Sequence, residues 1–203
     1  GTTAYGEASN CERKYQYHQI EKIVLKPALV PDPVRRGTWL ASCQEARRKG
    51  KDWTARLDEL REYAASVDVP TEKIDKLSTE VFDLLLGKIE FWAHEDAEYE
   101  FIGSEIELQA RVSPTLTLSA TLDGLARHET KGLGIIEDKS TQQIPTSEWR
   151  AVDPQTAIQY FVAKRNGYDV RWILFDYMKT TKAPVRGLRK TATSTQTRSP
   201  QLL

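Results

Sequence analysis

The chain has 203 residues, of which 39% are hydrophobic and 29% are charged, with 11 glycines and 9 prolines. This composition is that of a globular domain, and it excludes disordered, collagenous and low-complexity chains. No apolar run approaches the roughly 20 residues of a membrane span, and the first residues lack the pattern of a secretory signal. Two cysteines, Cys11 and Cys43, form neither a CxxC pair nor a disulfide framework, which indicates a reducing, cytoplasmic compartment.

The charges are balanced in number but not in position. The chain has 29 Lys and Arg and 29 Asp and Glu residues, yet residues 1–51 hold ten cations against five carboxylates, and residues 164–203 hold nine against two. Residues 89–110 carry seven carboxylates and no Lys or Arg. A basic periphery around an acidic centre fits a polyanion held against bound cations, and it equally fits a polarised surface.

We find no internal repeat or linker and expect one domain, 1–203, that is mainly helical over residues 1–95. The predicted helices are a short one opened by the capping box of Ser9 and Glu12, then 38–49 after Pro31 and Pro33, 53–67, and a long one from Thr71. The long helix has apolar residues at a period of 3.6, which is the clearest helical signal in the chain.

A sheet core is expected over residues 96–178, followed by a basic and possibly loose tail, 179–203. The predicted elements are strands at 99–112, 116–122 and 133–139, a helix at 155–166 and a strand at 170–177. Asp153 and Pro154 are typical of a helix start and Gly167 of its end. From Thr71 the order is therefore helix, three strands, helix, strand, which predicts an α/β fold.

Charged residues end two of these strands. Asp123 ends one, and Glu137 and Lys139 end the next, with strand alternation placing Asp138 on the opposite face. If the turn at 113–115 pairs Val112 with Leu116, Glu105 lies opposite Asp123. Three carboxylates and one lysine then meet at one edge of a sheet.

Such a group suits phosphoryl chemistry. Carboxylate oxygens bind Mg²⁺ or Mn²⁺, and a divalent ion lowers the pKa of a bound water and offsets charge on phosphorus. Lys139 would orient that water and stabilise the developing charge. The alternative is structural: Asp123-Gly124 forms a turn, and Glu137 and Lys139 are exposed strand-end charges. The apolar Ile135-Ile136 before Glu137 favours the first interpretation.

The runs Thr121-Leu122-Asp123-Gly124 and Gly134-Ile135-Ile136-Glu137-Asp138-Lys139-Ser140-Thr141 resemble the signature of the PD-(D/E)XK nucleases in their RecB-like branch. This branch includes phage and bacterial recombination exonucleases and CRISPR-associated adaptation nucleases. The segments from Ser9 to Tyr17 and from Gln155 to Gly167 are similar to two further segments of the branch. The resemblance covers about residues 9–184 and implies a restriction-endonuclease-like core, a central mixed sheet flanked by helices.

The resemblance also implies roles for single residues. Asp123 and Glu137 would be metal ligands, with the backbone carbonyl of Asp138 as a third, and Lys139 would be the catalytic lysine. Gln155 matches a helix glutamine that contacts the substrate or the lysine. Ala41 stands where many relatives have a metal-binding histidine, which would weaken a second metal site or shift that role to Glu105.

The expected function is that of a metal-dependent DNA nuclease, more specifically an exonuclease in recombination or DNA-end processing. The expected DNA contacts are Arg36, Trp149 and Lys182, through phosphates or a stacked base. We expect no membrane partner and no iron–sulfur cluster, because a cluster needs four thiolates and the chain has two cysteines. The alternatives are an inactive DNA-binding or scaffold protein on the same fold, and a nuclease that acts on RNA.

Overall fold

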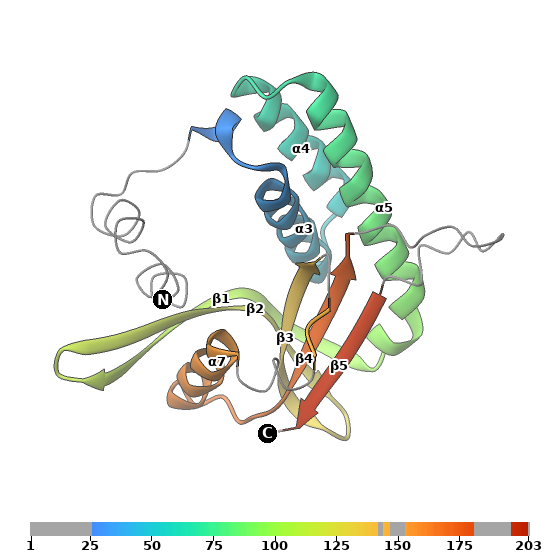
Figure 1. Ribbon diagram of the computed structural model, residues 1–203. Helices are drawn as coiled ribbons and strands as arrows, with labels where there is room; N and C mark the ends of the chain where they lie inside the picture. The colour runs from blue at the N-terminus through green and yellow to red at the C-terminus, as the bar shows by residue number, and fades with distance from the viewer. Residues whose placement is uncertain (1–25, 142–143, 147–152, 181–195, 203) are drawn as a thin grey trace.

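The computed structural model describes residues 26–141, 144–146, 153–180 and 196–202. The chain is α/β, with a mixed sheet whose strands lie in the order β1-β2-β3-β4-β5 (Figure 1). The first three strands are antiparallel, β3 and β4 are parallel, and β5 is antiparallel to β4. The elements are η2 (Pro27–Leu29), α3 (Asp32–Arg48), α4 (Trp53–Ser66), α5 (Thr71–Asp96), β1 (Tyr99–Ser113), β2 (Leu116–His128), β3 (Gly132–Thr141), α7 (Pro154–Arg165), β4 (Val170–Lys179) and β5 (Gln196–Leu202).

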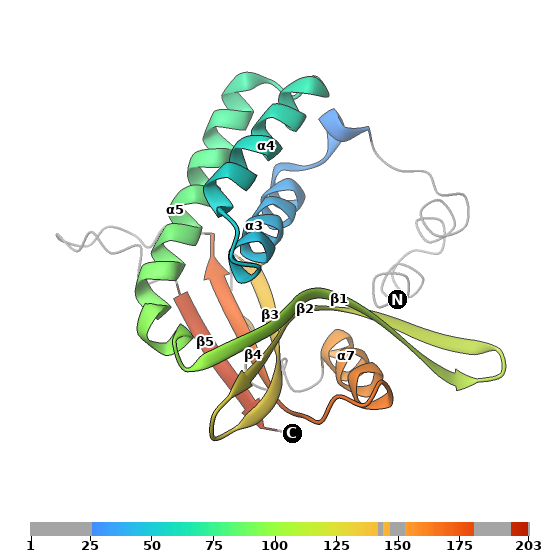
Figure 2. The ribbon, with the colours of Figure 1, turned by 180° about the vertical axis from the view of Figure 1, so that it is seen from behind.

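Helices α3, α4 and α5 form a layer on one side of the sheet, and α7 lies on the other side (Figures 1 and 2). Helix α3 begins at Asp32, six residues before the predicted start at Thr38. The prediction treated Pro33 as a break, but a proline in the first helical turn removes an N–H that has no partner there. Helix α4 begins after Asp52, whose side chain accepts hydrogen bonds from the N–H groups of Thr54 and Ala55.

The order from α5 onward is the predicted one: helix, three strands, helix, strand. The start of α7 is also as predicted, because Asp153 caps it by accepting from the N–H of Gln155, and Pro154 follows in the first turn. Gly167 lies just past its end with a φ of 86°, a left-handed conformation that favours glycine. Helix α7 packs against β1, β2 and β4.

Two strand predictions were wrong. The second strand does not end at Leu122 but continues to His128, so that Asp123 and Gly124 lie within β2 rather than in a turn. A side chain at Gly124 would crowd Arg48 and Ile136, which explains a glycine inside this strand. The end of the expected loose tail contains β5, an edge strand with Pro200 within it, and an edge strand tolerates a proline. Residues 181–195 of that tail lie outside the described part.

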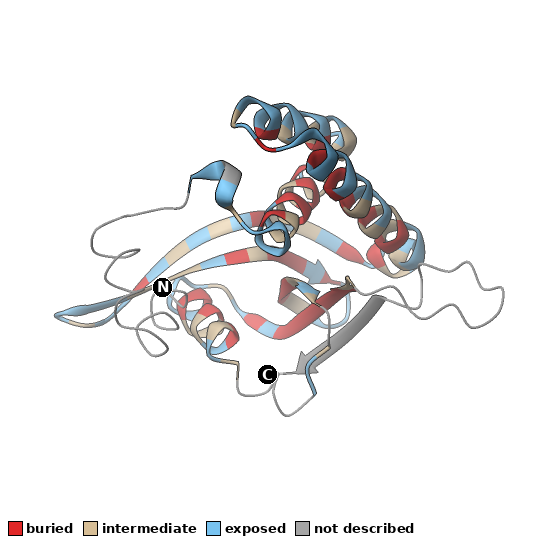
Figure 3. Ribbon diagram, turned by 45° about the horizontal axis from the view of Figure 1, so that its top comes forward, coloured by how far each residue is buried: buried red, intermediate tan, exposed pale blue. Residues whose placement is uncertain are grey.

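The central strand β3 is buried on both faces. On the α7 side, Ile135 packs in a cluster with Ile173 and Ala163, whereas on the other side Ile136 packs with Trp172 and Leu174. Buried positions continue almost without interruption along β4 (Figure 3). Charged residues that follow on β3 therefore face two protein layers. Within the described part of the chain, no helix combines the length and the apolar surface needed to cross a bilayer.

The packing of Trp172 on β3 gives a test of this core. A Cβ at Gly134 would overlap the Trp172 indole, which is fixed by its N–H donating to the Gly132 carbonyl at 3.0 Å. We expect Gly134→Ala to destabilise the fold by at least about 2 kcal/mol, since an added methyl in a packed core forces shifts. Gly37→Ala is the matched control, because its Cβ would meet only Ser140 Oγ at an ordinary 3.6 Å. We expect it to be neutral or stabilising by up to about 1 kcal/mol. Equal urea midpoints for the two variants would contradict this packing.

Candidate active site

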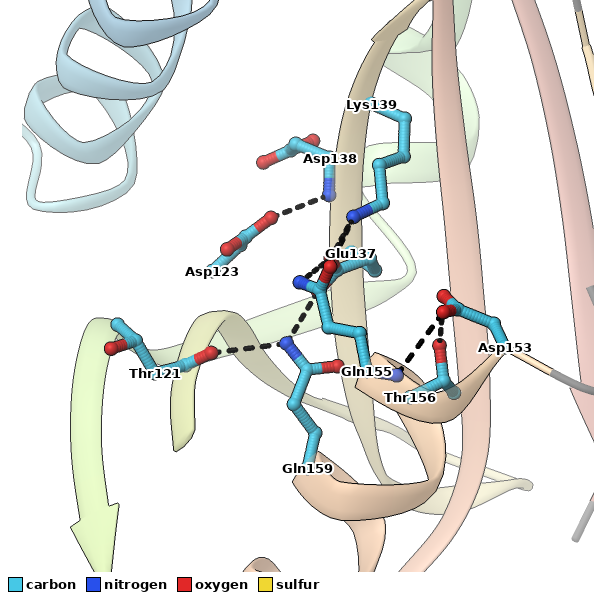
Figure 4. Close-up of polar contacts among 9 residues, drawn as sticks. All are labelled: Thr121, Asp123, Glu137, Asp138, Lys139, Asp153, Gln155, Thr156 and Gln159. Atoms are coloured by element: carbon cyan, nitrogen blue, oxygen red, sulfur yellow. Dashed lines mark hydrogen bonds and ion pairs between the residues drawn. The ribbon is translucent and has the colours of Figure 1, made fainter. Parts of the chain in front are cut away.

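Asp123 and Glu137 lie where the pairing of β2 with β3 stops. The last pair of this ladder is Gly124 with Ile136, and the next residue on each strand is one of the two carboxylates. Beyond this point the N–H of Asp138 donates not to a backbone carbonyl but to Asp123 Oδ2, at 3.0 Å (Figure 4). A side chain thus replaces the strand-to-strand bond and fixes Asp123 beside the start of Glu137-Asp138-Lys139.

Glu137 is fully buried, and hydrogen-bond donors surround its carboxylate (Figure 4). Oε1 accepts from Lys139 Nζ and from Gln155 Nε2, and Oε2 accepts from Gln159 Nε2 at 2.7 Å. The Gln159 amide also donates to the Thr121 carbonyl at 3.0 Å, so it joins Glu137 to β2. A buried carboxylate needs such partners, because an isolated charge removed from water is strongly destabilising.

Lys139 lies between the buried Glu137 and the solvent. Its side chain is 31% exposed, and Nζ also donates to Gln155 Oε1 at 3.0 Å. Gln155 belongs to the first turn of α7, which Asp153 fixes by accepting from the Gln155 N–H at 3.1 Å and from Thr156 Oγ1 at 2.9 Å. The cap of α7 therefore determines where the Gln155 amide meets the two charged residues (Figure 4).

Asp138 points to the opposite face, as strand alternation predicts. There its Oδ2 pairs with Arg48 Nη1 of α3 at 2.6 Å, and its Oδ1 pairs with Lys88 Nζ of α5 at 2.7 Å. The same Lys88 nitrogen lies 3.0 Å from Asp176 Oδ2 of β4. Two cations and two carboxylates, all more than nine-tenths buried, thus lie directly behind the site.

The pKa values of the acid residues are shifted in opposite directions: those of Asp123 and Glu137 are raised, whereas that of Asp138 is lowered. Burial, followed by the charge of Glu137, raises the pKa of Asp123 to about 7. Burial also raises the pKa of Glu137, outweighing the opposite effect of Lys139. Although burial opposes the charged form of Asp138, Arg48 and Lys88 hold its pKa well below the usual range. Burial likewise opposes the charged form of Lys139, but Glu137 and Asp123 outweigh it, so the Lys139 pKa is raised and the ammonium is retained at neutral pH.

The four residues predicted to act together do meet at this site: Asp123, Glu137, Lys139 and Gln155. Glu105 reaches the same level of the sheet, because the pairs on either side of it place it opposite Asp123, as expected. Its backbone is left-handed, however, with a φ of 52°, which interrupts the alternation on which the prediction depended. No hydrogen bond or ion pair between described residues joins it to Asp123 or Glu137, so its role as a metal ligand stays a prediction.

Of the three expected DNA contacts, only Arg36 lies among the residues that the structure describes. Arg36 forms an ion pair with Glu80 through both Nε, at 2.9 Å, and Nη2, at 2.6 Å, so its charge is already compensated. The neighbouring arginines of α3 are also engaged: Arg35 with the carbonyls of Pro27 and Val30, Arg47 with Asp96 and Arg48 with Asp138. These arginines of α3 therefore contribute to the fold, and the DNA contact of Arg36 stays a prediction. Trp149 and Lys182 lie outside the described residues, as does the segment from Ser9 to Tyr17.

Sequence reasoning missed three residues that hold the site: Gln159, Arg48 and Lys88. Gln159 had a signal, because it stands one helical turn after Gln155 and so shares its face. Lys88 also had one, since it occupies a position on the long helix that the 3.6 period assigns to the buried face near Leu85.

Cys43 is fully buried, as expected of a small packing residue, and burial raises the pKa of its thiol to about 11. Cys11 lies outside the described part.

No family model matches the chain, and no curated protein matches it. Among the residues that the structure describes, no three or more His, Cys, Asp or Glu side chains are arranged as a metal site. The chemical groups of the site are two carboxylates, one lysine and two amides.

The raised pKa of Asp123 predicts how the metal-free protein responds to pH. The unfolded carboxyl ionises near its ordinary 3.8, whereas the folded one keeps its proton to about pH 7. Between these values the folded state binds more protons, so Asp123 costs stability as pH rises from about 4 to 7 and no further above that. Asp123→Asn keeps an acceptor for the Asp138 N–H without a charge. In chelator-treated protein we expect it to match wild type near pH 4 and to exceed it by about 1–3 kcal/mol at pH 8. Urea melts across this range measure the difference, and a gap independent of pH would contradict the assignment.

Proposed function

We propose that the chain is a metal-dependent nuclease that hydrolyses phosphodiester bonds of DNA, on a restriction-endonuclease-like core. The observation that carries the proposal is the meeting of Asp123 and Glu137 on adjacent strands, at the point where their ladder ends, with Lys139 paired to Glu137. The order from α5 to β4 supports the core, because it is the one that the resemblance to PD-(D/E)XK nucleases implies.

The donor set fits a hard divalent cation such as Mg²⁺ or Mn²⁺. Asp123 and Glu137 offer carboxylate oxygens, and the backbone carbonyl of Asp138 would be the third ligand. Mg²⁺ is commonly held by one or two carboxylates together with water and substrate phosphate, so a full cage of side chains is not needed. Such an ion, when bound, lowers the pKa of a water and offsets charge on the phosphate.

The remaining residues of the site would orient the reacting groups and stabilise the negative charge that develops on the phosphate. Lys139 stays protonated beside Glu137, so it would act as a charged donor toward the attacking water and the phosphate oxygens rather than as a base. Gln155 contacts both Glu137 and Lys139. It would keep Lys139 aligned when the Glu137 carboxylate rotates away from the lysine to bind a metal ion. Gln159 holds the second Glu137 oxygen and the Thr121 carbonyl, which fixes the carboxylate from behind.

A second candidate function is an inactive DNA-binding or scaffold protein. The observation that favours it is that protein donors already satisfy both Glu137 oxygens, so the site is closed by its own ion pair. Against it stands the partial exposure of Lys139, because a lysine that only neutralises a core carboxylate has no need to reach the surface. The two candidates differ in turnover and can be separated by a cleavage assay.

The deciding experiment incubates the protein with end-labelled linear and circular DNA in Mg²⁺, in Mn²⁺ and in chelator. We expect linear DNA to be degraded with either metal and to remain intact with chelator; an exonuclease spares the circle. In single-turnover reactions Lys139→Ala should cleave about 10²-fold more slowly or worse while DNA affinity changes little, since its cation acts mainly in the transition state.

Lys164→Ala is the matched control, because Lys164 also pairs with a carboxylate, Asp169, but on the exposed end of α7. It should cleave at the wild-type rate. No degradation of any DNA with either metal would contradict the enzyme proposal, and degradation of RNA alone would change its substrate. Wild-type cleavage by a well-folded Lys139→Ala protein would remove the lysine from the mechanism.

A further inference from the structure

Arg48 spans the two strands that carry the acid residues. Its Nη1 lies 2.6 Å from Asp138 Oδ2 on β3 and donates to the backbone carbonyl of Asp123 on β2 at 3.0 Å. Its side chain is only 4% exposed. A side chain on Gly124 would lie 3.1 Å from the same nitrogen, so a glycine at this position leaves the guanidinium its room. The contact is therefore built into the interior and is not a chance surface pair.

The bond from Arg48 to the Asp123 carbonyl lies beyond the end of the β2–β3 backbone ladder. The β2–β3 ladder ends at Gly124 and Ile136, and beyond it side chains link the strands: the Asp138 N–H donates to Asp123 Oδ2, Arg48 contacts both the Asp123 carbonyl and Asp138, and Gln159 contacts both the Thr121 carbonyl and Glu137. Two of these contacts hold Asp123 itself, the first by its side chain and the Arg48 contact by its backbone. Together they determine how far Asp123 stands from β3.

Lys88 links the same residue, Asp138, to the neighbouring strand β4. Asp138 and Asp176 are register partners on the parallel strands β3 and β4, and like charges facing each other across a sheet are destabilising. Lys88 Nζ lies between them, within 3.0 Å of an oxygen of each. With Arg48, the group has two positive and two negative charges, which is the condition for burying it.

We infer that Arg48 is a positioning residue, which sets the separation of Asp123 from Glu137 by holding the Asp123 backbone to Asp138. The inference rests on the proposed function, because that separation matters for the cation that the two carboxylates would share. Groups that orient metal ligands from behind typically change metal affinity or activity by about 10–100-fold when they are removed. Arg48 donates to neither carboxylate of the pair, so the positioning effect proposed for it passes through its bonds to the two strands.

The test needs variants that keep the buried charges balanced. Arg48→Met combined with Asp138→Asn removes one cation and one anion, leaving Lys88 and Asp176 as a neutral pair. Arg48→Lys keeps all four charges but replaces the planar guanidinium by a single ammonium. Arg47→Met is the control, since Arg47 directly precedes Arg48 in α3 and also pairs with a carboxylate, that of Asp96 in α5, at 2.7 Å.

Three quantities are measured on each full-length variant: the melting temperature, the exchange rate of the amide at position 138 without metal, and Mn²⁺ affinity by calorimetry. We expect the double variant to melt within a few degrees of wild type, to exchange that amide at least about tenfold faster, and to bind Mn²⁺ about 10–100-fold more weakly. Arg48→Lys should shift the last two in the same direction by less, and Arg47→Met should leave both unchanged.

The outcomes separate the two claims. Wild-type amide exchange and Mn²⁺ affinity in a folded double variant, or in Arg48→Lys should the double variant not fold, would overturn the role of Arg48 alone. A wild-type protein that binds no Mn²⁺ and cleaves no DNA would overturn the proposed function. In that case the amide exchange rate still decides whether Arg48 holds the two strands together.

Discussion

Three consecutive charged residues, Glu137, Asp138 and Lys139, occupy a strand that is buried on both faces. Ionised groups removed from water are tolerated only with partners, so each layer that covers the strand must supply charges or donors. The helical layer of α3 and α5 supplies Arg48 and Lys88, and α7 supplies two glutamine amides. The positions of these helices and the charge state of the site are two consequences of the same constraint.

The parts of the fold that could be predicted from sequence are those governed by local rules. Strand alternation correctly placed Glu137 and Lys139 on one face and Asp138 on the other. Counting from the hairpin turn correctly set Glu105 opposite Asp123, although the pairing at the turn itself differs. Capping chemistry located the start of α7, and the 3.6 period located α5. Each of these signals lies within one continuous segment of the chain, a single helix or hairpin.

What could not be predicted depends on long-range contacts or on the sheet. The partners of Asp138 come from 50 and 90 residues earlier, and nothing local in α3 distinguishes the buried Arg48 from its partly exposed neighbour Arg47. The end of β2 was missed because Asp123-Gly124 has the composition of a turn, whereas the glycine is there to admit Arg48. The ion pair of Arg36 with Glu80 could not be predicted either, because the two residues lie 44 positions apart in the sequence.

The proposed function requires that Asp123 and Glu137 share a divalent cation on the α7 face of the sheet. The most direct measurement is anomalous diffraction from crystals soaked in Mn²⁺, because the signal locates the metal without assuming its ligands. We expect a peak in contact with both carboxylates and with the carbonyl of Asp138, and the loss of the Lys139 contact to Glu137. Crystals at saturating Mn²⁺ with no peak between the two carboxylates, and with Lys139 still bound to Glu137, would contradict it.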